Sequence, residues 1–536
     1  MLSNRQSVIP GWFIPGLIAS ILMFAVALAA FLALWFKAPA EPWSYLLQDK
    51  YIQHVVYFSF WQALLSALFS VLPAIFLARA LYRRRFPGRR IMLRLFAMNL
   101  ILPVLVAVFG ILSVYGRQGW VATLFQALGW KWNYSPYGLQ GILLSHVFFN
   151  LPMATRFFLQ MLEQIPGEQR QLAAQLGIRG LNFFRLIEWP WLWRQILPVS
   201  ALIFTLCFSS FTTVLSLGGG PRATTIELAI YQALTYDYDP VRAAMLAVIQ
   251  MACCLGIMLI SQSLSTTIAP GTTQMSGWHA PDDGIYSRFA DTLLIVLALL
   301  LLFPPLLAVI VDGLNPRLLQ VLSQLVLWQA LWTSLRIALA AGILCVVLSM
   351  MLLWSTRELR ARGRPLIGQM MELSGILILA MPGIVLATGL FLLLENTVGL
   401  PESANNIVIF TNALMAIPYA LKVLETPMFD ISIRYGLLCK SLGIQGINRL
   451  RLVELSALGR PITQAFAFAS VLSIGDFGIV ALFGNNSFRT LPFYLFQQIG
   501  SYRDNDGAVT ALLLLLLCFS LFALIENIPR NDARTQ

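Results

Sequence analysis

Long apolar runs, separated by short polar segments, follow one another along the whole chain. A helix needs about 20 apolar residues to cross the hydrocarbon core of a bilayer, and about twelve runs reach that length. They are continuous and do not alternate residue by residue, so they predict helices and not the strands of a membrane barrel. The spans are expected at residues 12–36, 57–82, 92–115, 138–163, 196–217, 243–264, 289–311, 328–355, 370–394, 407–427, 462–484 and 508–527. The pattern therefore predicts an all-α, polytopic membrane protein.

The first run, 12–36, could be either a signal peptide or a transmembrane helix, because it lies near the beginning of the chain. This run is too long for the apolar region of a signal peptide, and no convincing small-residue cleavage site follows it. We therefore expect a retained first transmembrane helix.

Composition and charge agree with a membrane protein. Hydrophobic residues make up 58% of the chain and charged residues 11%, with a mean hydropathy of +0.75, whereas soluble domains are about 25% charged. The net charge of +12 comes from cationic residues that collect in alternate polar segments, with a dense cluster at 79–85. By the positive-inside rule these segments face the cytoplasm, which places both chain termini there. The cluster is interpreted as a topology anchor beside anionic lipid, and no nucleic-acid partner is expected.

One short helical pattern occurs twice in the polar segments. The first copy, Gln171–Gly177, reads Gln-Leu-Ala-Ala-Gln-Leu-Gly and is followed by Ile187-Glu-Trp-Pro190. The second copy, Leu437–Gly443, reads Leu-Leu-Cys-Lys-Ser-Leu-Gly and is followed at the same distance by Val453-Glu-Leu-Ser456. Two matched loop helices favour the docking of a partner with two-fold symmetry. The alternative is a pair of amphipathic connectors that lie on the membrane surface.

The repeat extends beyond these loops, at offsets of 265 to 279 residues. Trp61-Gln-Ala-Leu64 recurs as Trp328-Gln-Ala-Leu331, and Leu151-Pro152 recurs as Ile417-Pro418. Leu100–Pro103, followed by Gly110, recurs as Leu379–Pro382, followed by Gly389. Thr225…Gln232 recurs as Thr490…Gln497. Six helices per half give both halves the same orientation, which makes this a parallel repeat. We expect a first half at 1–264 with its loop at 164–195, a cytoplasmic linker at 265–288, and a second half at 289–536 with its loop at 428–461.

Residues that serve catalysis and metal binding are sparse. The six cysteines lie mostly in apolar runs without metal-site spacing, and there are three histidines. The chain contains no phosphate-binding loop, dinucleotide fingerprint or serine nucleophile elbow. We therefore expect no catalytic site, no metal site and no cofactor, and no ATP hydrolysis by this chain. A membrane enzyme would need a catalytic cluster, and a channel would need a consistently polar pore helix; neither is found.

Asp476 is the sharpest candidate for a residue that lines a transport pathway. It lies in an apolar run, within Ser473–Gly478, where a carboxylate is costly unless it faces water or a partner. The alternative is that Asp476 caps a broken helix or pairs with Arg336 or Lys422. The corresponding segment of the first half is polar but uncharged, and it offers the candidates Ser209, Ser210 and Thr212.

The repeated loop resembles the coupling loop of ABC importer permeases of the binding-protein-dependent type. That motif reads Glu-Ala-Ala, three residues, Gly, nine residues, Ile-x-Leu-Pro. In this chain the matching positions are Gln171, Leu172 and Ala173 with Gly177 and Pro190, and Leu437, Leu438 and Cys439 with Gly443, while Ser456 replaces the second proline. Stretches similar to bacterial thiamine ABC transporter permeases are Ile187–Trp191, Leu215–Pro221, Thr224–Tyr231 and Ser473–Gly478. The resemblance covers nearly the whole chain, because fused permeases of this kind carry twelve helices.

The resemblance implies partners, a location and a mechanism. Two copies of a cytoplasmic ABC ATPase would act on the two coupling loops, a periplasmic binding protein would deliver thiamine, and the chain would lie in the bacterial inner membrane. ATP-driven closure of the ATPases would rock the two halves around a central site. The positive thiazolium ring of thiamine suits Asp476, and the phosphate esters of thiamine are further expected cargo. The alternatives are import of ferric iron by the same architecture and an ion-coupled secondary transporter, which would need more ionisable residues in the membrane.

Overall fold

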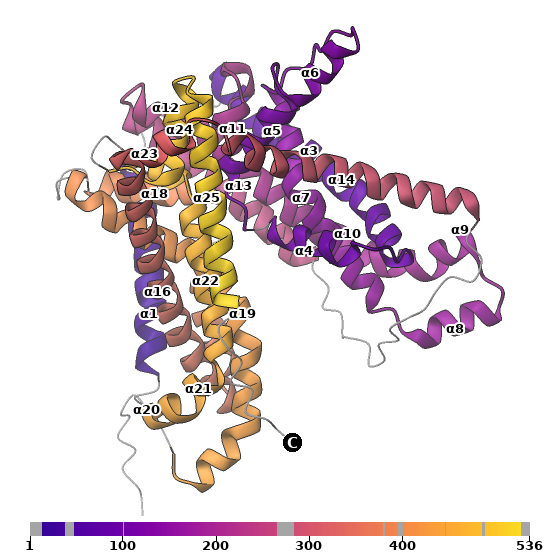
Figure 1. The fold of residues 1–536 in the computed structure, drawn as a ribbon. Helices are drawn as coiled ribbons and strands as arrows, with labels where there is room; N and C mark the ends of the chain where they lie inside the picture. The colour runs from indigo at the N-terminus through magenta and orange to yellow at the C-terminus, as the bar shows by residue number, and fades with distance from the viewer. Residues whose placement is uncertain are drawn as a thin grey trace, which may run out of the picture.

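Figure 1 shows the computed structural model, which describes residues 13–37, 48–99, 101–264, 284–378, 381–394, 400–444, 446–484 and 488–526. All regular elements in these ranges are helices. Ten helical segments among them are long and apolar enough to cross a membrane, which confirms the all-α, polytopic prediction. The predicted linker lies mostly outside the described residues, and so do the two chain ends that were assigned to the cytoplasm.

The helices fall into two series of matching order. The first series is α1 (Ile14–Lys37), α3 (Lys50–Arg83), α4 (Arg89–Met98), α5 (Val104–Tyr115), α6 (Trp120–Ala127), α7 (Leu139–Glu163), α8 (Gly167–Gln175), α9 (Gly180–Phe183), the π-helical turn η1 (Phe184–Glu188), α10 (Trp189–Phe208), α11 (Phe211–Leu217), the 3-10 turn η2 (Pro221–Ala223), α12 (Ile226–Thr235) and α13 (Pro240–Leu264).

The second series is α14 (Ile285–Gly313), α15 (Leu318–Leu322), α16 (Leu325–Ala361), α17 (Pro365–Leu377), α18 (Gly383–Leu394), α19 (Leu400–Ser441), α20 (Gly446–Arg449), the π-helical turn η4 (Leu450–Glu454), α21 (Leu455–Ala457), α22 (Gly459–Gly475), α23 (Gly478–Phe483), α24 (Leu491–Gly500) and α25 (Asp504–Glu526).

Four of the predicted spans are broken helices, so their prediction as continuous spans was wrong. The spans at 92–115 and 370–394 break before α5 and α18, directly ahead of which stand Pro103 and Pro382. Proline forces the residue before it out of the helical region, which ends a helix at that point. The spans at 196–217 and 462–484 break between α10 and α11 and between α22 and α23. Broken helices are tolerated at membrane depth where surrounding protein or a water-filled cavity satisfies the freed backbone groups.

The two halves exchange their first helices. α1 packs against α16, α17 and α18 of the second half, and α14 packs against α3 and α5 of the first. Glycine allows both close approaches: a Cβ atom at Gly110 would lie 2.3 Å from the carbonyl oxygen of Pro305 in α14, and one at Gly389 would lie 2.6 Å from that of Ala30 in α1. The repeat of these two glycines thus marks equivalent helix contacts.

The exchange is visible in the ribbon, where two arms meet near α12 and α24 and diverge toward α8 and α20 (Figure 1). The indigo α1 lies in the arm of α16 and α19, whereas α14 lies in the arm of α3, α7 and α10. The loops around α8 and α20 therefore occupy the far ends of two separate arms.

One of the sequence repeats does not mark equivalent positions in space. The backbone N–H of Ile226 donates to Ser59 Oγ at 3.0 Å, and that of Leu491 donates to Ser334 Oγ at 2.7 Å. The two serines hold the beginnings of α12 and α24 in the same way, and they lie 275 residues apart. The Trp61–Leu64 pattern recurs 267 residues later, about two helical turns out of that register, so its prediction as an equivalent segment was wrong.

Candidate functional site

The two predicted coupling helices end in the same backbone turn. Gly177, after α8, and Gly443, after α19, both have a φ of +67°. Three residues beyond the end of each loop helix, Ile178 N–H donates to the carbonyl of Ala173, and Ile444 N–H donates to that of Cys439, both at 2.9 Å. This is the Schellman pattern, in which a left-handed glycine lets an N–H beyond the helix satisfy a free carbonyl. The repeated sequence therefore encodes a repeated geometry.

Side chains at matched positions of the two loops also share their exposure. Ala173 and Cys439 are buried, which explains why both positions hold small residues. In both copies of the repeated pattern the leucines are more than half exposed, namely Leu172, Leu176, Leu437, Leu438 and Leu442, and Gln171 beside them is exposed as well. Exposed apolar side chains that recur in this way are typical of a protein-docking surface.

The two loops differ in how they join the membrane helices. α8 is a separate helix, whereas its counterpart is the last part of the 42-residue α19. Pro190 stands in the first turn of α10, which continues directly from η1. Ser456 lies instead in the short α21, and α22 begins only at Gly459.

Each loop leads into its next membrane helix through a π-helical turn that ends at a buried glutamate. These are Glu188 at the end of η1 and Glu454 at the end of η4, which are 1% and 0% exposed. Arg79 Nε of α3 donates to Glu188 at 2.6 Å. In the second half, Arg357 Nη1 of α16 lies 2.8 Å from Glu454 Oε1.

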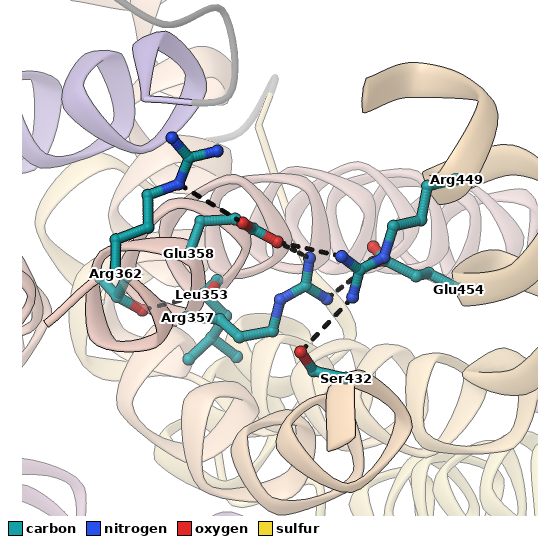
Figure 2. Close-up of polar contacts among 8 residues, drawn as sticks. Leu353, Arg357, Glu358, Arg362, Ser432, Arg449 and Glu454 are labelled. Atoms are coloured by element: carbon teal, nitrogen blue, oxygen red, sulfur yellow. Dashed lines mark hydrogen bonds and ion pairs between the residues drawn. The ribbon is translucent and has the colours of Figure 1, made fainter. Parts of the chain in front are cut away.

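Sequence reasoning placed Arg79 in the cationic cluster at 79–85, interpreted as a topology anchor, and assigned Glu188, Arg357 and Glu454 no role. Both glutamates nevertheless recur at the same distance after the loop glycine. Figure 2 shows the second group, in which Arg357, Arg449 and Glu454 lie among Glu358, Arg362 and Ser432. In the first group, burial lowers the pKa of the nearby Arg170 guanidinium from its ordinary value, and the Glu188 carboxylate opposes that shift. The loops are thus tied to the membrane helices by charge.

A cavity of about 440 Å³ lies among the broken helices. It is lined by the break before α5, the break between α10 and α11, the beginning of α18, and the break between α22 and α23, with further side chains from α7, α12 and α19. Both halves therefore contribute equivalent breaks to one cavity. Pockets between helices with a few polar groups are the usual setting of small-molecule sites.

All four predicted pathway residues line this cavity: Asp476, Ser209, Ser210 and Thr212. The Asp476 carboxylate accepts the backbone N–H groups of Gly478 and Ile479, at the beginning of α23. Its Oδ2 atom is buried and makes no hydrogen bond. Asp476 is therefore both the cap of a broken helix and a residue of the cavity wall. The Arg336 side chain, one alternative partner, donates to Asn405 Oδ1 at 3.2 Å.

Glu227, on α12, is a cavity residue that sequence reasoning missed. It is 3% exposed, and its carboxylate accepts the backbone N–H of Phe211 at the beginning of α11. Negative charge is favourable at a helix N-terminus, and α11 and α23 each begin against one carboxylate. The available signal was a glutamate beside an apolar run in Thr224–Tyr231.

Aromatic rings complete the cavity. Phe211 of one half and Phe477 of the other stack with ring centroids 6.2 Å apart and an interplanar angle of 16°, and Phe149 and Tyr419 also line the wall. Among the described lining residues, none is a lysine or an arginine. Within the described ranges no group of three or more His, Cys, Asp or Glu side chains is placed to hold a metal ion. Two carboxylates and several rings suit a flat organic cation.

Comparison with known proteins gives consistent matches. Residues 70–270 match the family model described as "Binding-protein-dependent transport system inner membrane component". The chain is 74% identical over 535 residues, the full length of both proteins, to the thiamine transport system permease protein ThiP of Escherichia coli strain K12. It is 42% identical over 513 residues to the protein of that name in Haemophilus influenzae, covering 96% of this chain and 95% of the relative. A probable sulfate transport system permease protein of Helicosporidium is 26% identical over 208 residues, 38% of this chain and 76% of the relative.

Proposed function

This chain belongs to the family of thiamine transport system permease proteins, and from that premise we propose how it imports its substrate. It is a multi-pass permease of the bacterial inner membrane and a transport subunit of the ABC class. The steps proposed are ATP-driven alternation of access, delivery by a binding protein, and passage of thiamine through the cavity between the broken helices.

The observation that carries the proposal is the pair of loop helices with matching Schellman turns and matching exposed leucines. Two identical ATPase subunits present two equivalent grooves, and a single fused chain needs two equivalent helices to fill them. We place one ATPase copy on α8 and the other on the last turns of α19. The ends of both arms then face the cytoplasm, and the opposite end, at α12 and α24, receives the periplasmic binding protein.

ATP binding to the two ATPase copies draws them together. Because α8 and the end of α19 lie on separate arms (Figure 1), this movement brings the arms together. Rigid-body rocking of packed helices about a fixed region is the common means of alternating access. ATP acts this way only if the closed ATPase pair binds one arrangement of the arms more tightly than the other.

Thiamine fits the cavity by its chemistry. Its thiazolium ring is cationic and flat, and the wall offers Asp476, Glu227 and the stacked rings of Phe211 and Phe477. Each phosphate group of a thiamine ester adds negative charge near carboxylates, with no cationic lining residue among those described to offset it. We therefore propose that thiamine itself is preferred over its phosphate esters and over ferric iron.

The first test is uptake of labelled thiamine by cells that lack this gene, with and without its restoration, and with ferric iron in parallel. Rescue of thiamine uptake alone is expected. Rescue of iron uptake instead would leave the proposed architecture in place and show that the substrate is ferric iron and not thiamine. In vesicles, uptake is expected to require ATP and the ATPase subunit; uptake that follows a proton gradient without ATP would refute the ATP-driven mechanism.

The second test concerns the cavity carboxylates. Asp476→Asn and Glu227→Gln replace each carboxyl group by an amide, which cannot carry a negative charge but keeps an oxygen that accepts the backbone N–H at the beginning of α23 or of α11. An exposed ion pair is worth about 0.2–1 kcal/mol, and loss of one partner of a buried pair costs about 3–5 kcal/mol. The apparent KM for thiamine is therefore expected to rise severalfold or more, with unchanged assembly with the ATPase. Unchanged uptake kinetics in both variants would exclude these carboxylates from the pathway.

A further inference from the structure

We propose that two arginine–glutamate pairs, each with a buried glutamate, are the rigid links through which each coupling loop moves the membrane helices. The pairs are Arg79–Glu188 and Arg357–Glu454, here called the first and the second clamp. This inference rests on the proposed ATP-driven function, because it concerns how force applied at the loops reaches the cavity. None of the four residues lines the cavity, so all four are positioning residues.

The two clamps are built from equivalent positions. Glu188 and Glu454 each end a π-helical turn, and each lies 11 residues after the glycine of its loop. Arg79 and Arg357 each lie four residues before the end of their helices, α3 and α16. π-Helical turns are rare in proteins, and those that occur are often found at functional sites. The same partners at equivalent positions of two halves with different sequences indicate a shared role.

The first clamp holds both ends of its turn. Arg79 donates to Glu188, the last residue of η1, and its guanidinium lies 4.7 Å from the ring centroid of Phe184, the first residue of η1. α8 is fastened to the same helix, because the Arg170 guanidinium lies 4.7 Å from the ring centroid of Tyr82 at the end of α3. The loop of the first half and the end of α3 therefore move together.

The second clamp is a larger network of alternating charges (Figure 2). Arg357 and Glu454 are 1% and 0% exposed. Arg449, at the end of α20, lies 2.9 Å from Glu454 and 3.3 Å from Glu358. Arg449 also donates to Ser432 Oγ of α19 at 3.4 Å. Removal of one member of such a network leaves another charge without its partner and away from water. The four charged groups, Arg357, Glu358, Arg449 and Glu454, therefore favour one fixed arrangement.

The clamped helices lead directly to the cavity. α3 packs along α7 and α10, which carry Asn150 and the break at Ser209. α16 packs along α19 and α22, which carry Asn412 and end at the break at Asp476. Because packed helices shift as units and do not deform continuously, a displacement of either clamp moves one side of the cavity wall. Without the clamps, the π-helical turns could yield while the membrane helices stayed in place.

The test uses the complete transporter, with its ATPase and binding protein, reconstituted in liposomes. The variants are Arg79→Met, Glu188→Gln, Arg357→Met and Glu454→Gln. The matched controls are Arg85→Met and Arg364→Met, which alter exposed arginines near the ends of the same two helices. The readouts are the number of thiamine molecules imported per ATP hydrolysed and the stimulation of ATP hydrolysis by the loaded binding protein.

The clamp variants are expected to import about tenfold less thiamine per ATP, or less still, while ATP hydrolysis continues. The controls are expected to match the wild type. A variant present in the membrane at the normal amount, with a wild-type ratio, would overturn the proposal. An equal fall of import and hydrolysis at a constant ratio would also overturn it, because that result indicates a purely structural role.

Two further variants cover the case in which a neutralised clamp fails to fold. Glu188→Asp and Glu454→Asp keep the charge but withdraw the carboxylate by one methylene group. An intermediate ratio is expected, and an unchanged ratio in both variants would refute the clamps. ATP-dependent import by the wild type separates the two levels of inference: its absence refutes the proposed function, whereas its presence with unaffected variants refutes the clamps alone.

Discussion

Gly110→Ala tests whether the exchange of first helices holds the two halves together. The added Cβ atom would lie 2.3 Å from the carbonyl oxygen and 2.9 Å from the carbonyl carbon of Pro305, and 3.1 Å from Val309 Cγ2. Favourable contacts between non-bonded heavy atoms lie at about 3.5–4.0 Å, so α5 and α14 must separate by roughly 1 Å. The closest obstacles are backbone atoms, which cannot rotate away. Overpacking of this kind costs about 1–3 kcal/mol.

The substitution also has a favourable effect, because alanine is a better helix former than glycine by about 1 kcal/mol. Gly256→Ala in α13 supplies the matched control, since nothing lies within 4 Å of its added Cβ atom. The difference between the two variants therefore isolates the packing cost.

The assay is thermal unfolding of the purified protein in detergent, followed by loss of the folded, monodisperse species. Gly110→Ala is expected to unfold at a lower temperature than the wild type, and Gly256→Ala at the same or a higher temperature. Gly389→Ala should resemble Gly110→Ala, because its Cβ atom would lie 2.6 Å from the carbonyl oxygen of Ala30. If Gly110→Ala is as stable as Gly256→Ala, the close approach of α5 and α14 is not a structural constraint.

Two further predictions concern a loop turn and a buried hydroxyl group. Gly443→Leu places a side chain on a residue with a φ of +67°, a conformation that costs other residues about 1–2 kcal/mol. The protein is expected to insert normally but to lose thiamine uptake per molecule in the membrane; normal uptake would count against the coupling role of this turn. Ser334→Ala leaves the buried backbone N–H of Leu491 without its acceptor, which costs about 1–3 kcal/mol. Its unfolding temperature should fall below that of Ser323→Ala, which removes only an exposed hydroxyl; equal temperatures would contradict the assignment.

The outcome of the sequence predictions depended on how local each signal was. The Schellman turns at Gly177 and Gly443 need only a short helix and a glycine, and the repeated pattern identified both positions. The prolines Pro103 and Pro382 indicate the helix breaks beside them. These breaks were missed because the spans were predicted from the length of each apolar run, and the residues on both sides of each proline are apolar. Glu227 was missed because one carboxylate in a short segment gives no indication of which cavity it faces.

Contacts between distant segments could not be predicted in the same way. The pairing of Arg357 with Glu454 joins residues 97 positions apart, and nothing in either local pattern selects one arginine among the 36 cationic residues of the chain. The shift in register between the Trp61 and Trp328 patterns has the same origin, because a similar short sequence can recur on a helix without occupying the same depth. Only the bonds from Ile226 to Ser59 and from Leu491 to Ser334 fixed the register.

The sequence by itself determined that this is a helical membrane protein of two parallel halves with matched loops. Those properties follow from the lengths of apolar runs in a solvent that cannot hydrogen-bond to the backbone, and from patterns of a few consecutive residues. The tertiary structure alone decided the exchange of α1 and α14, the cavity between four helix breaks, and the two clamps. The physical reason is that lipid favours any apolar helix equally, so the choice of neighbours rests on close packing and buried charge pairs, which involve residues far apart in the chain.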